Sequence, residues 1–215
     1  MNILSAKNLF FRYNTNQAWI LKDFFLEVKA GEIIQIKGNS GCGKTTLLYN
    51  LCGVIPKTIH GIQKGIINIF GKPILSFSLP ELSLKISILL QNPEHQLFFP
   101  SVEQELAFYP ENLRIEPKVI EHRLSKILKE LEIEQLRNRE TAFLSYGEKK
   151  LVALASLLTF SPQVLLLDEL FNGISDKKIE LLITLIQKLS QQGKAIIATE
   201  HLNFFSKIAT KTIEL

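Results

Sequence analysis

A glycine-rich stretch, GNSGCGKT, has the residue types and spacing of a phosphate-binding loop. It fits the pattern G-x-x-x-x-G-K-[ST] at every fixed position, follows the apolar segment EIIQIK and opens the helical segment TTLLYNLCG. Backbone N–H groups of such a loop converge on phosphate oxygens, and the helix N-terminus adds a favourable dipole. Lys44 would reach the β- and γ-phosphates of a nucleoside triphosphate, and the Thr45 hydroxyl would coordinate Mg²⁺. The predicted nucleotide-binding residues here are Gly38, Asn39, Ser40, Gly41, Cys42, Gly43, Lys44, Thr45 and Thr46.

Two adjacent carboxylates, Asp168 and Glu169, end a second apolar segment, VLLLDE. In a nucleotide-binding α/β sheet the ligand lies at the carboxyl ends of the strands. Asp168 is therefore predicted to hold the Mg²⁺ shell, and Glu169 is predicted to polarise the attacking water. The same pair in isolation would also fit a strand that runs into an acidic helix cap. The phosphate loop favours the catalytic interpretation.

Strands and helices that alternate along the chain must position these groups. The segments EIIQIK, ISILL, QVLLLD and KAIIAT read as buried strands, and KKIELLITLIQKL reads as a helix with an apolar stripe. Apolar strands of this kind imply an α/β sheet covered on both faces. The charged middle, about 101–140, reads as helical, including the whole of PKVIEHRLSKILKELEIEQL, and it resembles an inserted lobe.

Composition narrows the class of protein. A chain of 215 residues with 46% hydrophobic and 21% charged residues is typical of one folded domain. A net charge of +4 without a basic block is too weak to favour nucleic acid, so no nucleic-acid partner is expected. The N-terminus lacks the pattern of a signal peptide. The uncharged run Leu151–Leu167 is broken by Ser161-Pro162, so it reads as a buried helix, a turn and a strand instead of a membrane span.

With these residues placed, the chain resembles the ATP-binding cassette (ABC) ATPases over nearly its whole length. Four further features follow in the order and spacing of that family: Tyr13, Gln91, the segment FLSYGEKK at 143–150, and His201. The resemblance implies that Tyr13 stacks on adenine and that His201 senses the γ-phosphate. It also implies that Gln91 joins the Mg²⁺ site and links it to the helical lobe. FLSYGEKK stands where the family places its LSGGQ signature.

The resemblance also implies a fold and a mechanism. The fold is a single α/β domain over 1–215: a P-loop NTPase (RecA-like) core with an N-terminal antiparallel β subdomain and an inserted α-helical signature subdomain. The core covers 1–90 and 160–215, and the helical subdomain covers about 92–158. Two such chains would sandwich two ATP molecules head to tail, one chain giving the phosphate loop and the other the signature. The implied signature contacts are Ser145, Gly147 and Glu148, the catalytic set is Glu169, His201, Lys44 and Gln91, and the metal set is Thr45, Gln91 and Asp168.

A finer likeness lies in QNPEHQLFFPSVEQELAFYPENL, residues 91–113. It is similar to the ATPases of energy-coupling factor (ECF) importers, which take up vitamins and transition metals, including the cobalt and nickel group. In that group this surface meets a membrane-embedded coupling subunit. The resemblance implies an importer ATPase at the cytoplasmic face of the membrane; the transported substrate is not encoded in this chain.

The chain departs from the family pattern at two places that face a partner. Tyr146 replaces a signature glycine, and Ser175 stands where the family has an aspartate that couples the two sites. Ser145 and Glu148 have the spacing of a capping box, so a tyrosine at 146 need not break the backbone. We expect a working but altered phosphate grip, with the Tyr146 ring crowding the dimer interface. The second ATPase subunit is either a copy of this chain or a different one. The alternative function is a low-activity regulatory subunit of an asymmetric heterodimer.

Overall fold

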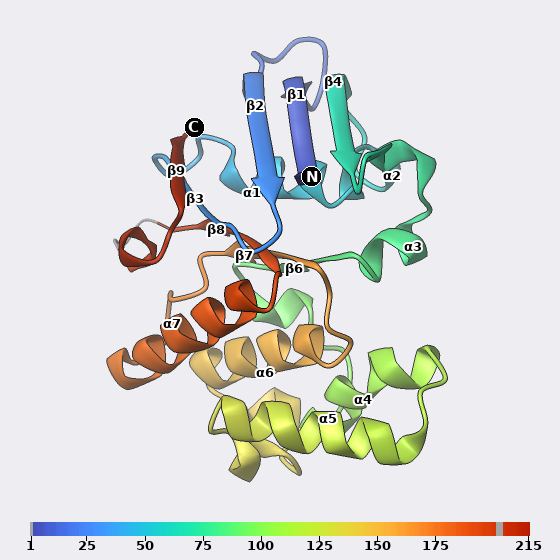
Figure 1. Ribbon diagram of the computed structural model, residues 1–215, viewed down its shortest axis with the longest axis vertical. Coiled ribbons are helices and arrows are strands. Elements are labelled where there is room, and N and C mark those ends of the chain that lie inside the picture. The colour runs from blue at the N-terminus through green and yellow to red at the C-terminus, as the bar shows by residue number, and fades with distance from the viewer. Residues whose placement is uncertain (1, 201–203) are drawn as a thin grey trace.

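Two sheets form the framework of the protein, which a computed structural model describes over residues 2–200 and 204–215 (Figure 1). An antiparallel sheet with the order β2-β1-β4-β5 contains β1 (Asn2–Arg12), β2 (Leu21–Lys29), β4 (Ile62–Ile69) and β5 (Lys72–Pro73). A parallel sheet with the order β6-β7-β8-β3-β9 contains β3 (Ile33–Lys37), β6 (Ile86–Leu89), β7 (Val164–Asp168), β8 (Ala195–Thr199) and β9 (Lys211–Glu214). The α/β architecture predicted from the sequence is confirmed.

The inner parallel strands β7 and β8 are mostly apolar because both of their faces are covered, whereas the edge strand β9 is largely exposed. Along β7, Val164 and Leu166 point into one core, and Leu165 and Leu167 point into the other. The first core also contains residues of β1, β2, β4 and the helix α1. The second contains residues of the helices α4, α5, α6 and α7. The parallel sheet is therefore the middle layer, with the antiparallel sheet at the top of Figure 1 and the helices α4, α5, α6 and α7 below the parallel sheet.

Seven helices complete this part of the chain: α1 (Lys44–Leu51), α2 (Val54–Lys57), α3 (Leu79–Ser83), α4 (Val102–Asn112), α5 (Pro117–Glu130), α6 (Tyr146–Leu158) and α7 (Asp176–Gln191). The apolar stripe of α7 is buried as predicted. The helix predicted to run to Leu136 ends at Glu130, since Glu132 adopts a left-handed φ of 52° and a short 3-10 turn follows. Helical geometry does not tolerate a positive φ, so the chain must turn there.

The uncharged run 151–167 has the predicted helix, turn and strand. Its first part belongs to α6, which ends at Leu158, and its last part belongs to β7, which begins at Val164. Ser161 adopts a left-handed φ of 62° between them. Among the helices within 2–200 and 204–215, none combines the length and apolar character needed to cross a bilayer.

Candidate functional site

The glycine-rich loop between β3 and α1 has a backbone that only glycine adopts without strain at two points. Gly41 and Gly43 have φ values of 78° and 109°, and a Cβ added to Gly43 would lie 2.5 Å from Ile20 Cγ2. The Lys44 side chain is buried, and its ammonium donates to the carbonyls of Gly38 at 2.9 Å and Asn39 at 3.0 Å. The loop therefore curls around a positive charge at the start of α1, which is an arrangement suited to phosphate.

A cavity of about 310 Å³ joins this loop to groups from other parts of the chain. Its lining residues are Tyr13, Ile20, Ser40, Gly41, Gly43, Lys44, Thr45, Thr46, Gln91 and Glu169. Tyr13 is 40% exposed, and its hydroxyl lies 3.0 Å from Thr46 Oγ1. Ile20 is the one lining residue that sequence reasoning missed, because an isolated apolar residue before β2 carries no pattern.

Asp168 connects the loop to the sheet. Its Oδ2 accepts a hydrogen bond from Thr45 Oγ1 at 2.6 Å, and its Oδ1 accepts one from Thr199 Oγ1 at 2.5 Å. A hydroxyl and a carboxylate in contact are hard oxygen ligands of the kind Mg²⁺ prefers. Across residues 2–200 and 204–215, no cluster of three or more His, Cys, Asp or Glu side chains could hold a metal. Thr45 and Asp168 fit a Mg²⁺ ion whose remaining ligands would come from phosphate and water.

Glu169 follows β7 in a strained conformation. Its φ is 49°, which is uncommon for a residue with a side chain. Its N–H donates to the Thr199 carbonyl at 3.0 Å, and Gln91 Nε2 donates to its Oε2 at 2.8 Å. Gln91 therefore contacts the carboxylate expected to activate water, and its predicted place in the Mg²⁺ site stays a prediction.

Lys150 was not singled out by sequence reasoning, although it binds the backbone of the segment that begins at Glu169. It is fully buried on α6, and its Nζ donates to the carbonyls of Glu169 at 2.6 Å and Asn172 at 3.3 Å. Burial lowers the pKa of this ammonium, an effect that nearby carboxylates partly offset. A lysine at the head of an otherwise apolar helix was the available sequence signal, because a buried charge needs partners.

Glu200 is a second residue that the sequence did not reveal. It directly follows β8, is 3% exposed and accepts a hydrogen bond from the Phe171 N–H at 2.8 Å. Burial raises the pKa of its carboxyl to about 7. The loop that begins at Glu169 is therefore held by a buried base and a buried acid, Lys150 and Glu200.

The raised pKa of Glu200 predicts a pH-dependent stability. Between its unfolded pKa of 4.5 and its folded pKa of about 7, the folded chain holds a proton that the unfolded chain has released. The free energy of unfolding should therefore fall as pH rises through this window, by about 3 kcal/mol from this group alone. Glu200→Gln should remove that slope, so urea unfolding curves of the two proteins should diverge between pH 4.5 and 8. Parallel curves would contradict this assignment.

The signature residues lie apart from the phosphate loop within one chain. Ser145 caps α6 and forms the predicted capping box with Glu148. Ser145, Gly147 and Glu148 line a separate cavity of about 470 Å³ together with Gly173 and Ser175. The two cavities share no lining residue. His201 falls outside the described residues, so its role stays a prediction.

Tyr146 is turned toward its own chain. Its hydroxyl donates to the Gln91 carbonyl at 2.7 Å. A Cβ added to Gly173 would lie 2.6 Å from its Cδ1, so the ring packs directly on that glycine. Tyr146 is still 40% exposed, and the crowding of a dimer interface by its ring stays a prediction.

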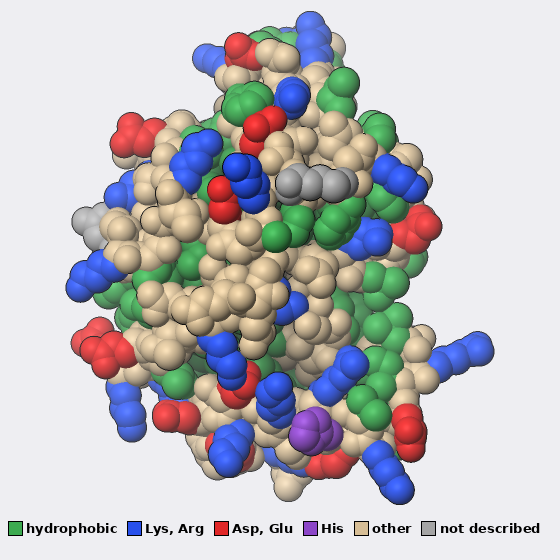
Figure 2. All heavy atoms as spheres, in the orientation of Figure 1, with side chains coloured by type: hydrophobic (Ala, Val, Ile, Leu, Met, Phe, Trp, Pro, Cys, Tyr) green, Lys and Arg blue, Asp and Glu red, His purple; other side chains and the backbone are tan. Residues whose placement is uncertain are grey.

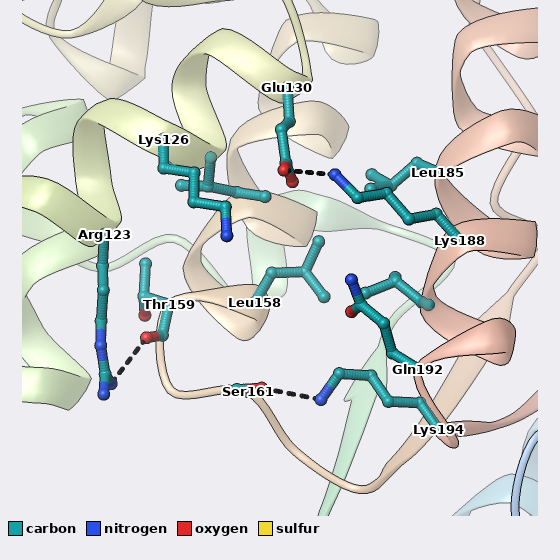
Figure 3. Close-up of a pocket in the computed structure, with 12 residues that line it drawn as sticks. Arg123, Lys126, Glu130, Leu158, Thr159, Ser161, Leu185, Lys188, Gln192 and Lys194 are labelled. Carbon is teal, nitrogen blue, oxygen red and sulfur yellow. Dashed lines mark hydrogen bonds and ion pairs between the residues drawn. The ribbon is translucent and has the colours of Figure 1, made fainter.

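A third cavity, of about 290 Å³, lies between α5, the end of α6 and α7 and is lined largely by polar side chains (Figure 3). Lys188 Nζ on α7 pairs with Glu130 Oε1 on α5 at 2.7 Å. Arg123 donates to the Thr159 carbonyl at 3.2 Å, and Lys194 donates to Ser161 Oγ at 2.8 Å. Cations at the carboxyl end of α6 complement its dipole, so this cavity reads as structural and not as part of the nucleotide site.

Comparison with known proteins agrees with this geometry. The profile of the ABC transporter family matches residues 21–172. The energy-coupling factor transporter ATP-binding protein EcfA of Methanocaldococcus jannaschii is 35% identical over 203 residues, which are 94% of this chain and 71% of that protein. A relative from Treponema denticola is 32% identical over 212 residues, which are 98% of this chain. The chain spans only 43% of the length of that relative.

Solved structures share the fold. The structure of cbiO1 from Clostridium perfringens, part of the ABC transporter complex cbiONQ, matches with a TM-score of 0.85 and 30% identity, covering 99% of this chain and 84% of that one. A dimeric ATP-binding cassette in a post-hydrolysis state, bound to ADP and Pi, has a TM-score of 0.85 at 22% identity and covers 99% and 94%. At that identity it supports the fold alone. This chain belongs to the ABC transporter family.

Proposed function

We propose that this chain binds Mg²⁺-ATP, hydrolyses it and thereby energises an importer of the energy-coupling factor type, from the cytoplasmic face of the membrane. The observation that carries the enzymatic part is the 310 Å³ cavity, which joins the phosphate loop, Gln91 and Glu169 around one space. EcfA and cbiO1, named above, support the importer class. A vitamin or a transition-metal ion is the proposed cargo class.

The residues divide the chemical work. The loop N–H groups and Lys44 neutralise phosphate charge, which is the main contribution to phosphoryl transfer. Bound Mg²⁺, held by Thr45, Asp168 and Gln91, would supply further charge neutralisation. Glu169 orients and polarises the attacking water, and the proposed γ-phosphate contact is His201.

A second cassette completes each site in this proposal. Within one chain the signature cavity and the phosphate-loop cavity are separate. One nucleotide can therefore contact both a phosphate loop and a signature only if a second cassette supplies one of them. The partner is a copy of this chain or a different subunit. Tyr146 and Ser175 favour a different one, because they alter what this chain presents across the interface. The matched residues make up 43% of the Treponema denticola relative, so the unmatched part of that protein is longer than this chain.

The proposed contact with a membrane-embedded subunit is the surface at 91–113. Phe98 is 78% exposed, and Phe108 and Leu113 are also exposed. Hydrophobic side chains gather along the flank that carries α3 and α4 (Figure 2). Exposed aromatic residues are characteristic of the centres of protein interfaces.

Phe98→Ser tests this contact. The amount of membrane subunit that co-purifies with the tagged chain should fall about tenfold or more. The reason is that an aromatic side chain buried at the centre of an interface contributes at least about 2 kcal/mol to binding. ATP binding should stay unchanged. Phe25→Ser is the matched control, since Phe25 is 52% exposed on β2 and lies outside both 91–113 and the signature segment 143–150. Equal co-purification by the wild type and the Phe98 variant would contradict the proposed contact.

The second candidate function is a low-activity regulatory subunit. The contact between Gln91 and Glu169 favours it, because an amide hydrogen-bonded to the carboxylate competes with water. The two functions differ in the ATP turnover of the chain in its complete assembly. Robust cooperative hydrolysis by the purified chain alone would count against an obligatory different partner.

A further inference from the structure

Two side chains on one face of α6 reach toward the catalytic loop. Tyr146 and Lys150 are four residues apart, which places them on the same side of a helix. The Lys150 ammonium lies 5.4 Å from the centre of the Tyr146 ring. Both residues touch the segment 169–173: Lys150 binds the Glu169 carbonyl, and Tyr146 packs on Gly173.

The contact with Gly173 is closely fitted. Gly173 has a φ of +77°, and any Cβ there would lie 2.6 Å and 2.9 Å from two ring carbons of Tyr146. A glycine at 173 and a ring at 146 therefore accommodate each other. A glycine at 146 would leave this space without a packing partner and would remove the donor to Gln91.

Three hydrogen bonds connect α6 to Gln91, Gln91 to Glu169, and Glu169 back to α6. Tyr146 donates to the Gln91 carbonyl at 2.7 Å, and Gln91 Nε2 donates to Glu169 Oε2 at 2.8 Å. Lys150 on α6 then donates to the Glu169 carbonyl at 2.6 Å. Gln91 and Glu169 are thus fixed relative to each other and to the helix whose N-terminus carries Ser145.

We propose that Tyr146 is a positioning residue for ATP hydrolysis: its hydroxyl holds the Gln91 backbone so that Gln91 and Glu169 keep their relative placement. The proposal rests on the proposed function in one respect, since α6 begins with the signature that would face a second nucleotide. A displacement of that helix N-terminus is then transmitted to the chain's own catalytic carboxylate. The residue that replaces a signature glycine supplies the link.

Tyr146→Phe tests the link, because it keeps the ring against Gly173 and removes only the hydroxyl. In the nucleotide-free chain, amide hydrogen exchange over 90–96 should accelerate about fivefold, the size expected for one net hydrogen bond. Exchange in α1 should stay the same. Tyr109→Phe is the matched control: the Tyr109 ring stacks on Phe160, and within the described residues its hydroxyl has no hydrogen-bond partner. Unchanged exchange over 90–96 in Tyr146→Phe would overturn the proposal.

A kinetic measurement separates positioning from simple packing. In the assembled ATPase, Tyr146→Phe should lower kcat about fivefold and leave the KM for ATP within twofold, because the ring stays in place and the hydroxyl that is removed is bonded to the Gln91 carbonyl. An unchanged kcat, or a KM that rises in step with the loss, would overturn the positioning role. If the wild type hydrolyses no ATP in any assembly, the proposed function fails, while the exchange measurement still decides whether Tyr146 holds Gln91.

Discussion

Glu169→Gln is expected to lower ATP hydrolysis about a hundredfold or more while ATP binding persists. A general base typically contributes about 10²–10⁴-fold, and a glutamine amide keeps the size of the side chain but cannot accept the proton. The phosphate loop, with Lys44 and Thr45, is unaffected by the change, so the dissociation constant for ATP should stay within about threefold. Phosphate release and equilibrium binding of labelled ATP are the two measurements.

Glu180→Gln is the matched control for that prediction. Glu180 is exposed on α7 and lies outside the phosphate-loop cavity, so the variant should hydrolyse ATP as the wild type does. Equal loss in both variants would point to a general electrostatic effect. Hydrolysis that survives in Glu169→Gln would assign the base to another group.

Lys150→Met is expected to reduce both stability and turnover. The change removes the charged donor from the carbonyls of Glu169 and Asn172, while the Glu169 carbonyl keeps the 3.3 Å hydrogen bond from the Asn172 N–H. Loss of a hydrogen bond to a charged group costs about 1.5–3 kcal/mol. Relief from burying an ammonium offsets part of this cost, so we expect a net loss of about 2 kcal/mol in the free energy of unfolding. Turnover should fall at least about tenfold, since the strained backbone at Glu169 loses an anchor. Urea unfolding and steady-state hydrolysis measure the two effects.

Lys149→Met provides the comparison one residue away. Lys149 Nζ pairs with Glu94 at 2.6 Å, and Glu94 is largely exposed, so its loss should cost less than about 1 kcal/mol. Turnover should change little. If the two lysine variants were equally stable and equally active, the role assigned to Lys150 would be wrong.

The sequence was most informative where one local segment carries the chemistry. The phosphate loop needs glycines, a lysine and a threonine in consecutive positions, so its pattern is visible without a structure. The place of Asp168 and Glu169 beside the phosphate loop was predictable because the ligand of a nucleotide-binding α/β sheet lies at the carboxyl ends of its strands. The capping box at Ser145 and Glu148 is likewise a short-range pattern, and the structure confirms it.

Residues that act across the fold were not predictable in the same way. Lys150 and Glu200 depend on which carbonyl and N–H groups packing brings beside them. The direction of the Tyr146 ring was decided by Gly173, which is 27 residues away and leaves room only because it lacks a Cβ. The end of α5 at Glu130 depended on the left-handed conformation of Glu132. A glycine at that position would have indicated the helix end in the sequence, but a glutamate does not.

The size of the Glu169→Gln complex in Mg²⁺-ATP tests the central claim most directly. If two cassettes enclose the nucleotide, slowed hydrolysis should trap them together. Native mass measurement of the purified assembly should then show two cassettes with two bound ATP molecules, and the pair should separate when ADP replaces ATP. A Glu169→Gln chain that binds ATP but stays single, with every co-purifying subunit present, would contradict the account.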